Sequence, residues 1–223
     1  PERIVLVSPM IGVTSFARFA GLAGLPAVFP AFARSAWLNT QPEFNPFKYN
    51  SFPVNAARQS WLLTKKLQKS LAGAADNGDI ARLPPVLTFQ SVVDATVRTD
   101  AVVSAFYQHL PANGSELVLF DINQAAIYRP LLTPDTWTAV SRLLPSAPRR
   151  YQTTVITNLS ANTPQVHALV THAGQPGAHA EPLNLRWPSD VYSLSHIALP
   201  FPESDSLYGR TPDKRNEFGI SIG

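Results

Sequence analysis

Short apolar runs and segments with helical spacing alternate along the first half of the chain. Residues 3–9 (RIVLVSP) form a continuous apolar run that ends at Ser-Pro, which predicts a strand buried on both faces of a parallel sheet. Residues 86–94 and 117–122 form two further runs rich in β-branched and aromatic side chains. Between these two runs, residues 100–110 carry apolar side chains at helical spacing. The pattern therefore predicts a β-α-β unit.

A long segment separates the first predicted strand from the second. Roughly 75 residues lie between them, far more than the few-residue connections typical of compact domains. Residues 54–73 predict one helix, with lysines in its last turns and Gly73 as the candidate C-cap. Residues 14–38 are apolar and rich in Phe, with helical spacing broken by prolines. We expect this part of the chain to be an insertion with its own structure.

The periodicity weakens after Gln124. A helix is predicted over residues 134–144, and strands are predicted over residues 151–159 and 166–172. Several glycines and prolines follow before residue 190. We interpret residues 124–189 as an irregular, β-containing insertion.

Composition excludes several classes of protein. The chain has 223 residues, of which 45% are hydrophobic and 15% charged, with a net charge of +3, so it is too apolar to be disordered. It contains no Cys, which excludes disulfide scaffolds, Cys-based zinc sites and thiol catalysis. The basic charge is too dilute to favour nucleic acid as a partner, and the histidines at 167 and 172 lack a third metal ligand nearby. Catalytic chemistry would therefore depend on Ser, His and carboxylates. We expect no cofactor.

Two residues are candidates for acid–base chemistry. Asp94 follows the second predicted strand, and ligands of open α/β sheets gather at the carboxyl ends of the strands. His196 lies much later, in an apolar segment flanked by prolines. An Asp at a strand end followed by a loop His is the order found in α/β-hydrolase triads. The alternatives are that Asp94 is a helix N-cap or turn former and that His196 is a partly buried structural residue. Asp121 is the second candidate for the acid.

The segments RIVLVSPMIG, PPVLTFQSVVDATV, ELVLFDIN and SLSHIALPFPESDSLYG carry a family resemblance. Together they resemble the C-terminal half of an α/β-hydrolase of the serine esterase and lysophospholipase-like type, over most of residues 1–123 and 190–209. The resemblance implies an α/β fold with a mainly parallel sheet, helices on both of its faces and a helical cap or lid at residues 14–52. It implies that Asp94 is the triad acid and His196 the triad base, whereas residues 124–189 depart from the family pattern.

The family's nucleophile motif, G-x-S-x-G, does not occur in the sequence. In family order the nucleophilic serine precedes the strand at residues 3–9, so we expect it upstream of Pro1. Residues 1–223 are then the C-terminal part of one hydrolase domain, a partial fold that is inactive alone and whose partner is the N-terminal remainder of the same polypeptide. The implied reaction is hydrolysis of acylglycerol or lysophospholipid-like esters. The alternatives are a non-catalytic module that binds a ligand or partner, and acyl transfer or peptide cleavage on the same scaffold.

Aromatic side chains in the insertion are candidates for substrate binding. They can line an acyl pocket or make transient contact with a membrane surface, and the alternative is that they form the core of the cap itself. These candidates are Phe16, Phe19, Phe29, Phe32 and Trp37.

Overall fold

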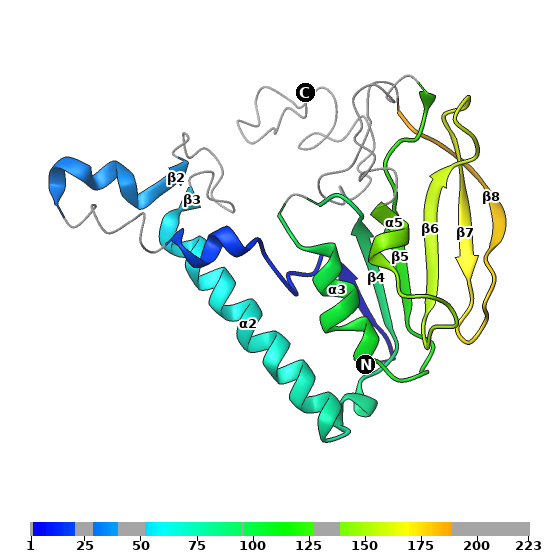
Figure 1. Cartoon of the computed structure of the whole chain (residues 1–223), viewed down its shortest axis with the longest axis horizontal. Helices are drawn as coiled ribbons and strands as arrows, with labels where there is room; N and C mark the ends of the chain where they lie inside the picture. The colour runs from blue at the N-terminus through cyan, green and yellow to red at the C-terminus, as the bar shows by residue number, and fades with distance from the viewer. Residues whose placement is uncertain (1, 21–28, 40–51, 95, 127–138, 189–223) are drawn as a thin grey trace. The chain divides into compact units, whose positions relative to one another are not determined.

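The computed structural model describes residues 2–20, 29–39, 52–94, 96–126 and 139–188 (Figure 1). The chain divides into two compact units. Unit 1 comprises residues 1–14 and 64–197, and unit 2 comprises residues 15–63 and 198–223. His196 and the predicted helical residues 134–138 lie outside the described residues.

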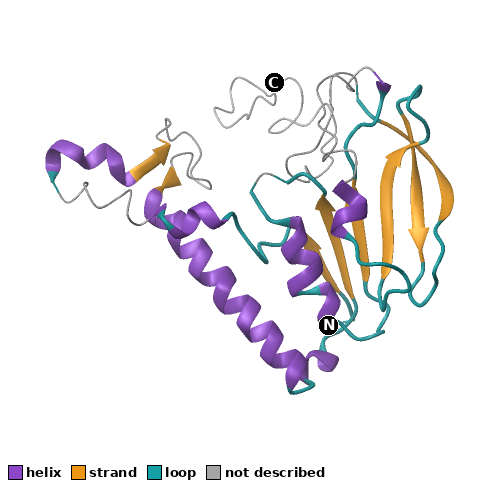
Figure 2. Cartoon of the chain, in the orientation of Figure 1, coloured by secondary structure: helices purple, strands orange, loops and turns teal. Residues whose placement is uncertain are grey.

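A six-stranded sheet forms the centre of unit 1 (Figure 2), in the order β1-β4-β5-β6-β7-β8. The first four strands are parallel, and β7 and β8 continue the sheet in antiparallel pairing. The sheet is therefore mixed and mostly parallel, as predicted for an α/β fold. The strands are β1 (Ile4–Val7), β4 (Val86–Ser91), β5 (Glu116–Phe120), β6 (Gln152–Asn158), β7 (Gln165–Thr171) and β8 (His179–Arg186).

The predicted β-α-β unit is confirmed. Strand β4 leads into α3 (Thr99–Ala105) and the short 3-10 helix η5 (Tyr107–His109), and the chain returns through β5, parallel to β4. Helix α5 (Ala139–Leu143) contacts α3, and both lie in front of the sheet in Figure 1. Apolar side chains of α3 and η5 fill the core with those of β4 and β5, because the helical spacing places one face toward the sheet.

Helix α2 (Val54–Asp76) is longer than the sequence predicts. Gly73 was expected to end it, but the helix continues for three more residues, and Gly78 adopts the left-handed conformation (φ 81°) after it. The expectation was wrong because apolar side chains on both sides of Gly73, among them Leu71 and Ala74, pack against the core. Tertiary packing of this kind outweighs the roughly 1 kcal/mol that a helical glycine costs.

Strand β1 was predicted to be buried on both faces, and this is wrong. It is the edge strand of the described sheet, and the side chains of Val5 and Val7 are 59% and 41% exposed. Ile4 and Leu6 pack against the core from the other face. A continuous apolar run therefore marked the strand correctly but did not reveal its position in the sheet.

The region interpreted as an insertion contributes three strands, between residues 152 and 186, to the main sheet. The strands predicted at 151–159 and 166–172 are confirmed as β6 and β7, and β6 pairs in parallel with β5. Strand β8 was not predicted, because it carries Pro182 and its side chains are mostly exposed. Both features are tolerated at the edge of a sheet.

The described part of unit 2 consists of short elements and the start of α2. These elements are two 3-10 helices, η1 (Ser15–Arg18) and η3 (Pro30–Ala36), and an antiparallel pair, β2 (Trp37–Asn39) with β3 (Phe52–Pro53). Pro30 occupies the first turn of η3. A backbone N–H in this turn has no acceptor within the helix, so the N–H that proline lacks is not needed there. The predicted helical segment is thus formed by short 3-10 turns in its described part.

Candidate functional site

The carboxyl ends of β1, β4, β5 and β6 meet at one edge of the sheet, because the four strands are parallel. This edge is where open α/β sheets place ligands and catalytic groups. Polar residues follow the ends of these strands. Among them, Ser8, Asp94 and Asp121 have side chains that could act as a nucleophile or as an acid.

Asp94 lies in the turn after β4, and its carboxylate accepts three hydrogen bonds from described residues. Oδ1 accepts the backbone N–H groups of Thr96 at 2.8 Å and Val97 at 2.9 Å. Oδ2 accepts the side-chain amide of Gln90 at 3.3 Å. Each carboxylate oxygen can accept two hydrogen bonds, so Oδ2 has capacity for a further donor beyond Gln90 among the described residues.

The turn that carries Asp94 is tied to the segment after β1. Val97 forms a β-bridge with Val13, and the N–H of Arg98 donates to the carbonyl of Gly12 at 2.9 Å. The side chain of Gln68, on α2, donates to the neighbouring carbonyl of Ile11 at 2.8 Å. The acid is therefore placed by contacts between segments that are far apart in the sequence.

Gln90 is fully buried on β4 and is a residue that the sequence analysis missed. Its amide nitrogen lies 3.3 Å from Asp94 Oδ2 and 3.1 Å from Thr99 Oγ1. The hydroxyl of Thr99 in turn donates to the carbonyl of Ser91 at 2.7 Å. Gln90 thus links the acid to the start of α3, and the available signal was a Gln inside an otherwise apolar strand.

Asp121 follows β5 and is buried, with 5% of its surface exposed. Oδ2 accepts hydrogen bonds from the Thr157 hydroxyl at 2.9 Å and the Gln124 amide at 2.7 Å, and Oδ1 accepts the N–H of Ile122 at 2.8 Å. Burial raises the pKa of Asp121 above its usual range, and the hydrogen bonds oppose this rise. Its donors come from β6 and from the loop after β5, so the Asp121 carboxylate links this loop to β6.

Asn158, at the end of β6, adds further hydrogen bonds to the loop after β5. Its amide donates to Asn123 Oδ1 at 3.0 Å and to the carbonyl of Thr163, while its own Oδ1 accepts the N–H of Gln124 at 2.7 Å. Asn158 therefore bonds to two parts of the chain, the loop after β5 and the turn at Thr163, and fixes the loop after β5. Its role depends on long-range contacts that local sequence patterns do not encode.

Ser8 is the first residue after β1 and has a left-handed backbone, with φ of 44°. Strained residues of this kind collect at functional sites, and a serine after a strand invites comparison with a nucleophile. Its hydroxyl, however, is buried, and the next residue is Pro9, which has no N–H to stabilise an oxyanion. Ser8 therefore lacks the accessibility and the backbone donor that nucleophilic catalysis requires.

The structure places only part of the predicted site. Asp94 is at the expected edge of the sheet, whereas His196 lies outside the described residues. The backbone of Phe16 belongs to η1, but its side chain is not described. The other candidate aromatics belong to unit 2 and are 44% to 65% exposed, which contradicts a role as a closed core for Phe19, Phe29, Phe32 and Trp37.

Within the ranges that the structure describes, no three His, Asp or Glu side chains come together as metal ligands. None of the helices in the same ranges combines the length and apolar character needed to cross a bilayer.

Comparison with known proteins adds no relative. No protein-family model, no curated protein and no solved structure matches the chain.

Proposed function

We propose that the protein hydrolyses carboxylic esters of the acylglycerol or lysophospholipid type by a Ser-His-Asp mechanism. Asp94 is the acid, His196 is the base, and the serine lies upstream of Pro1. The observation that carries the proposal is the Asp94 carboxylate, fixed by three hydrogen bonds at the carboxyl end of a parallel strand with capacity left on Oδ2.

The proposed roles follow from the chemistry of acyl transfer. His196 takes the proton of the serine hydroxyl as the serine attacks the ester carbonyl, and it returns that proton to the leaving alcohol. Water then attacks the acyl-enzyme carbonyl as His196 takes its proton, and His196 returns that proton to the serine oxygen as the ester bond to serine breaks and the carboxylic acid leaves. Asp94 accepts the other imidazole N–H, which holds the productive tautomer and stabilises the imidazolium.

The experiment is covalent labelling of the full-length protein with a fluorophosphonate probe, which reacts with activated serines. We expect the wild type to label, and His196→Ala and Asp94→Asn to lose most labelling. Asp100→Asn is the matched control, because Asp100 is a surface residue of α3 paired with Arg98. Labelling equal to wild type in His196→Ala would overturn the proposal.

The alternative is a non-catalytic binding module on the same scaffold. A well-folded wild type that does not label and does not cleave short-chain acyl esters would favour this module. Labelling that requires His196 but not Asp94 would keep the hydrolase and exclude Asp94 as its acid.

A further inference from the structure

Unit 2 exposes an unusual set of aromatic side chains. We name these side chains the aromatic surface; its members are Phe19 (56% exposed), Phe29 (65%), Phe32 (58%), Trp37 (44%) and Phe52 (45%). On the first half of α2, Leu62 and Leu63 are exposed as well. This many large exposed apolar side chains within one small unit favour an interaction surface.

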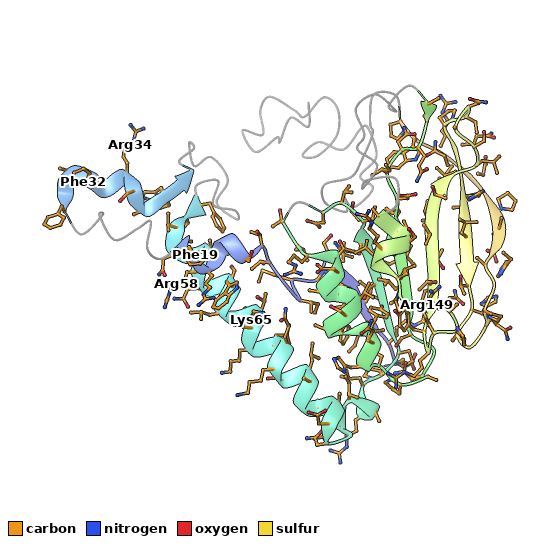
Figure 3. The ribbon with its side chains drawn as sticks, in the orientation of Figure 1. Phe19, Phe32, Arg34, Arg58, Lys65 and Arg149 are labelled. Atoms are coloured by element: carbon orange, nitrogen blue, oxygen red, sulfur yellow. The ribbon has the colours of Figure 1, made fainter. Side chains whose placement is uncertain are left out.

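The charged side chains that the structure describes in this unit all have one sign. Its described residues contain Arg18, Arg34 and Arg58, all exposed, and no Asp or Glu. Figure 3 shows Arg34 and Phe32 on η3, and Arg58 and Phe19 near the start of α2. A partner that satisfies the arginines must therefore be anionic, and a partner that covers the aromatic surface must also be apolar.

Arg18 shows how the two properties combine. Its guanidinium lies 5.6 Å from the centre of the Phe19 ring and 5.9 Å from the centre of the Trp61 ring. A guanidinium is weakly hydrated and stacks readily on aromatic faces. The positive charge thus lies next to apolar rings. A surface that contacts lipid headgroups and acyl chains at the same time needs this combination.

Local structure fixes part of this surface. In η3 the N–H of Phe32 donates to the carbonyl of Phe29 at 2.9 Å, and the Ser35 hydroxyl donates to the carbonyl of Phe32 at 2.8 Å. Trp37 then pairs with Pro53 between β2 and β3. The aromatic side chains are therefore displayed by hydrogen-bonded backbone, which lowers the entropy lost on binding.

We propose that unit 2 docks on the surface of an anionic lipid bilayer, with the aromatic surface in the interface and the three arginines on lipid headgroups. Anionic lipid supplies both required properties in one partner. A second copy of this surface would instead oppose arginines to arginines. Single-stranded nucleic acid can also stack on aromatic rings, but it has no acyl interior to cover Leu62 and Leu63.

The test is co-sedimentation of the full-length protein with vesicles of phosphatidylcholine alone or of phosphatidylcholine mixed with phosphatidylglycerol. We expect binding to the mixed vesicles only, with strong weakening at about 0.5 M salt, because salt screens the headgroup charge. Arg34→Gln with Arg58→Gln should weaken partitioning about 25-fold, at about fivefold per arginine. Phe29→Ser with Phe32→Ser should weaken it at least about tenfold.

The matched control is Leu185→Ser with Arg82→Gln, which changes an exposed leucine and an exposed arginine of unit 1. It should alter partitioning by less than about twofold, because both residues belong to unit 1 and neither is part of the aromatic surface. His196→Ala should bind vesicles like the wild type, which separates this proposal from the proposed esterase activity. Equal binding to both vesicle types, unchanged binding of the arginine or phenylalanine variants, or binding of a single-stranded oligonucleotide without vesicle binding would overturn it.

Discussion

The side-chain amide of Gln90 donates a hydrogen bond to Asp94 Oδ2 across 3.3 Å, from inside a strand to the turn that follows it. Gln90 is fully buried, so water cannot replace a hydrogen-bond partner that its amide loses. The same amide reaches Thr99 at the start of α3. The position of the candidate acid is therefore coupled to the interior of the sheet.

Replacement of Gln90 by Leu should lower the free energy of unfolding by about 1–3 kcal/mol. The substitution removes the donor to Asp94 and Thr99 and leaves both acceptors near the protein interior. Urea denaturation followed by circular dichroism measures this loss. The matched control is Gln108→Leu, because Gln108 is exposed on η5, and a change of similar size in the control would contradict the assigned role.

Replacement of Asp121 by Asn should change how stability depends on pH. Because burial raises the pKa of Asp121 in the folded state, the folded protein binds its proton more tightly than the unfolded chain does. The contribution of Asp121 to stability is therefore present below the unfolded carboxyl pKa, and it is lost as the pH rises through the raised folded value. The difference in stability between wild type and Asp121→Asn should accordingly fall over this interval.

Thermal and urea unfolding across the acid range measure that difference. At neutral pH the variant keeps only one acceptor oxygen for the three donors of Thr157, Gln124 and Ile122, which we expect to cost about 1–3 kcal/mol. Asp79→Asn is the control, since Asp79 is exposed and pairs only with neighbouring residues. A pH-independent difference between wild type and Asp121→Asn would disprove the burial argument.

Apolar runs were enough to predict the elements that build the parallel sheet. The strands now seen as β1, β4 and β5, and the helix between the last two, each carry a local pattern of hydrophobic side chains. The order of strands and their edges depend on pairing between distant segments. This is why the exposure of Val5 and Val7 on β1 was not foreseen.

The candidate site was predictable only at one residue. Asp94 is visible because a carboxylate follows an apolar run, and strand ends are where such groups gather. The roles of Gln90 and Asn158 depend on neighbours that are close in space. One partner of Asn158 is Asn123, which lies after a different strand. Such partners are set by the register of the sheet, which the sequence does not show directly.

Two buried tyrosines in contact should respond differently to loss of the hydroxyl. Tyr107 donates to the carbonyl of Glu116 at 2.6 Å, whereas the Tyr151 hydroxyl has no hydrogen-bond partner among the described residues. Their rings meet edge to face at 4.9 Å, so each phenylalanine variant keeps the same aromatic contact. Burial raises the pKa of both phenols, and both hydroxyls are therefore neutral donors at ordinary pH.

We expect Tyr107→Phe to lower the free energy of unfolding by about 1–2 kcal/mol, because the Glu116 carbonyl loses a donor. Tyr151→Phe should leave stability unchanged or raise it by up to about 1 kcal/mol, since it removes a buried hydroxyl without a partner. Equilibrium urea unfolding of the two variants in parallel measures both values. Equal destabilisation by the two substitutions would show that the hydroxyl of Tyr151 has a partner of similar strength.

Two glycines should respond in opposite directions to an added methyl group. A Cβ atom on Gly12 would lie 2.5 Å from the Cβ of Ala101 on α3, so the backbone that anchors the Asp94 turn would have to shift. Gly12→Ala should therefore cost about 1–3 kcal/mol. A Cβ on Gly73, inside α2, meets nothing within 4 Å, and Gly73→Ala should stabilise by about 0.5–1 kcal/mol because alanine favours a helix.

Thermal denaturation of the two alanine variants and of Gly12→Ala with Ala101→Gly measures these effects. The double variant removes the Cβ that Ala101 places against residue 12, so it should recover part of the stability lost in Gly12→Ala. No recovery in the double variant would mean that the loss comes from the backbone of residue 12 and not from its approach to α3. In that case the close contact between α3 and the segment after β1 would not be what fixes the Asp94 turn.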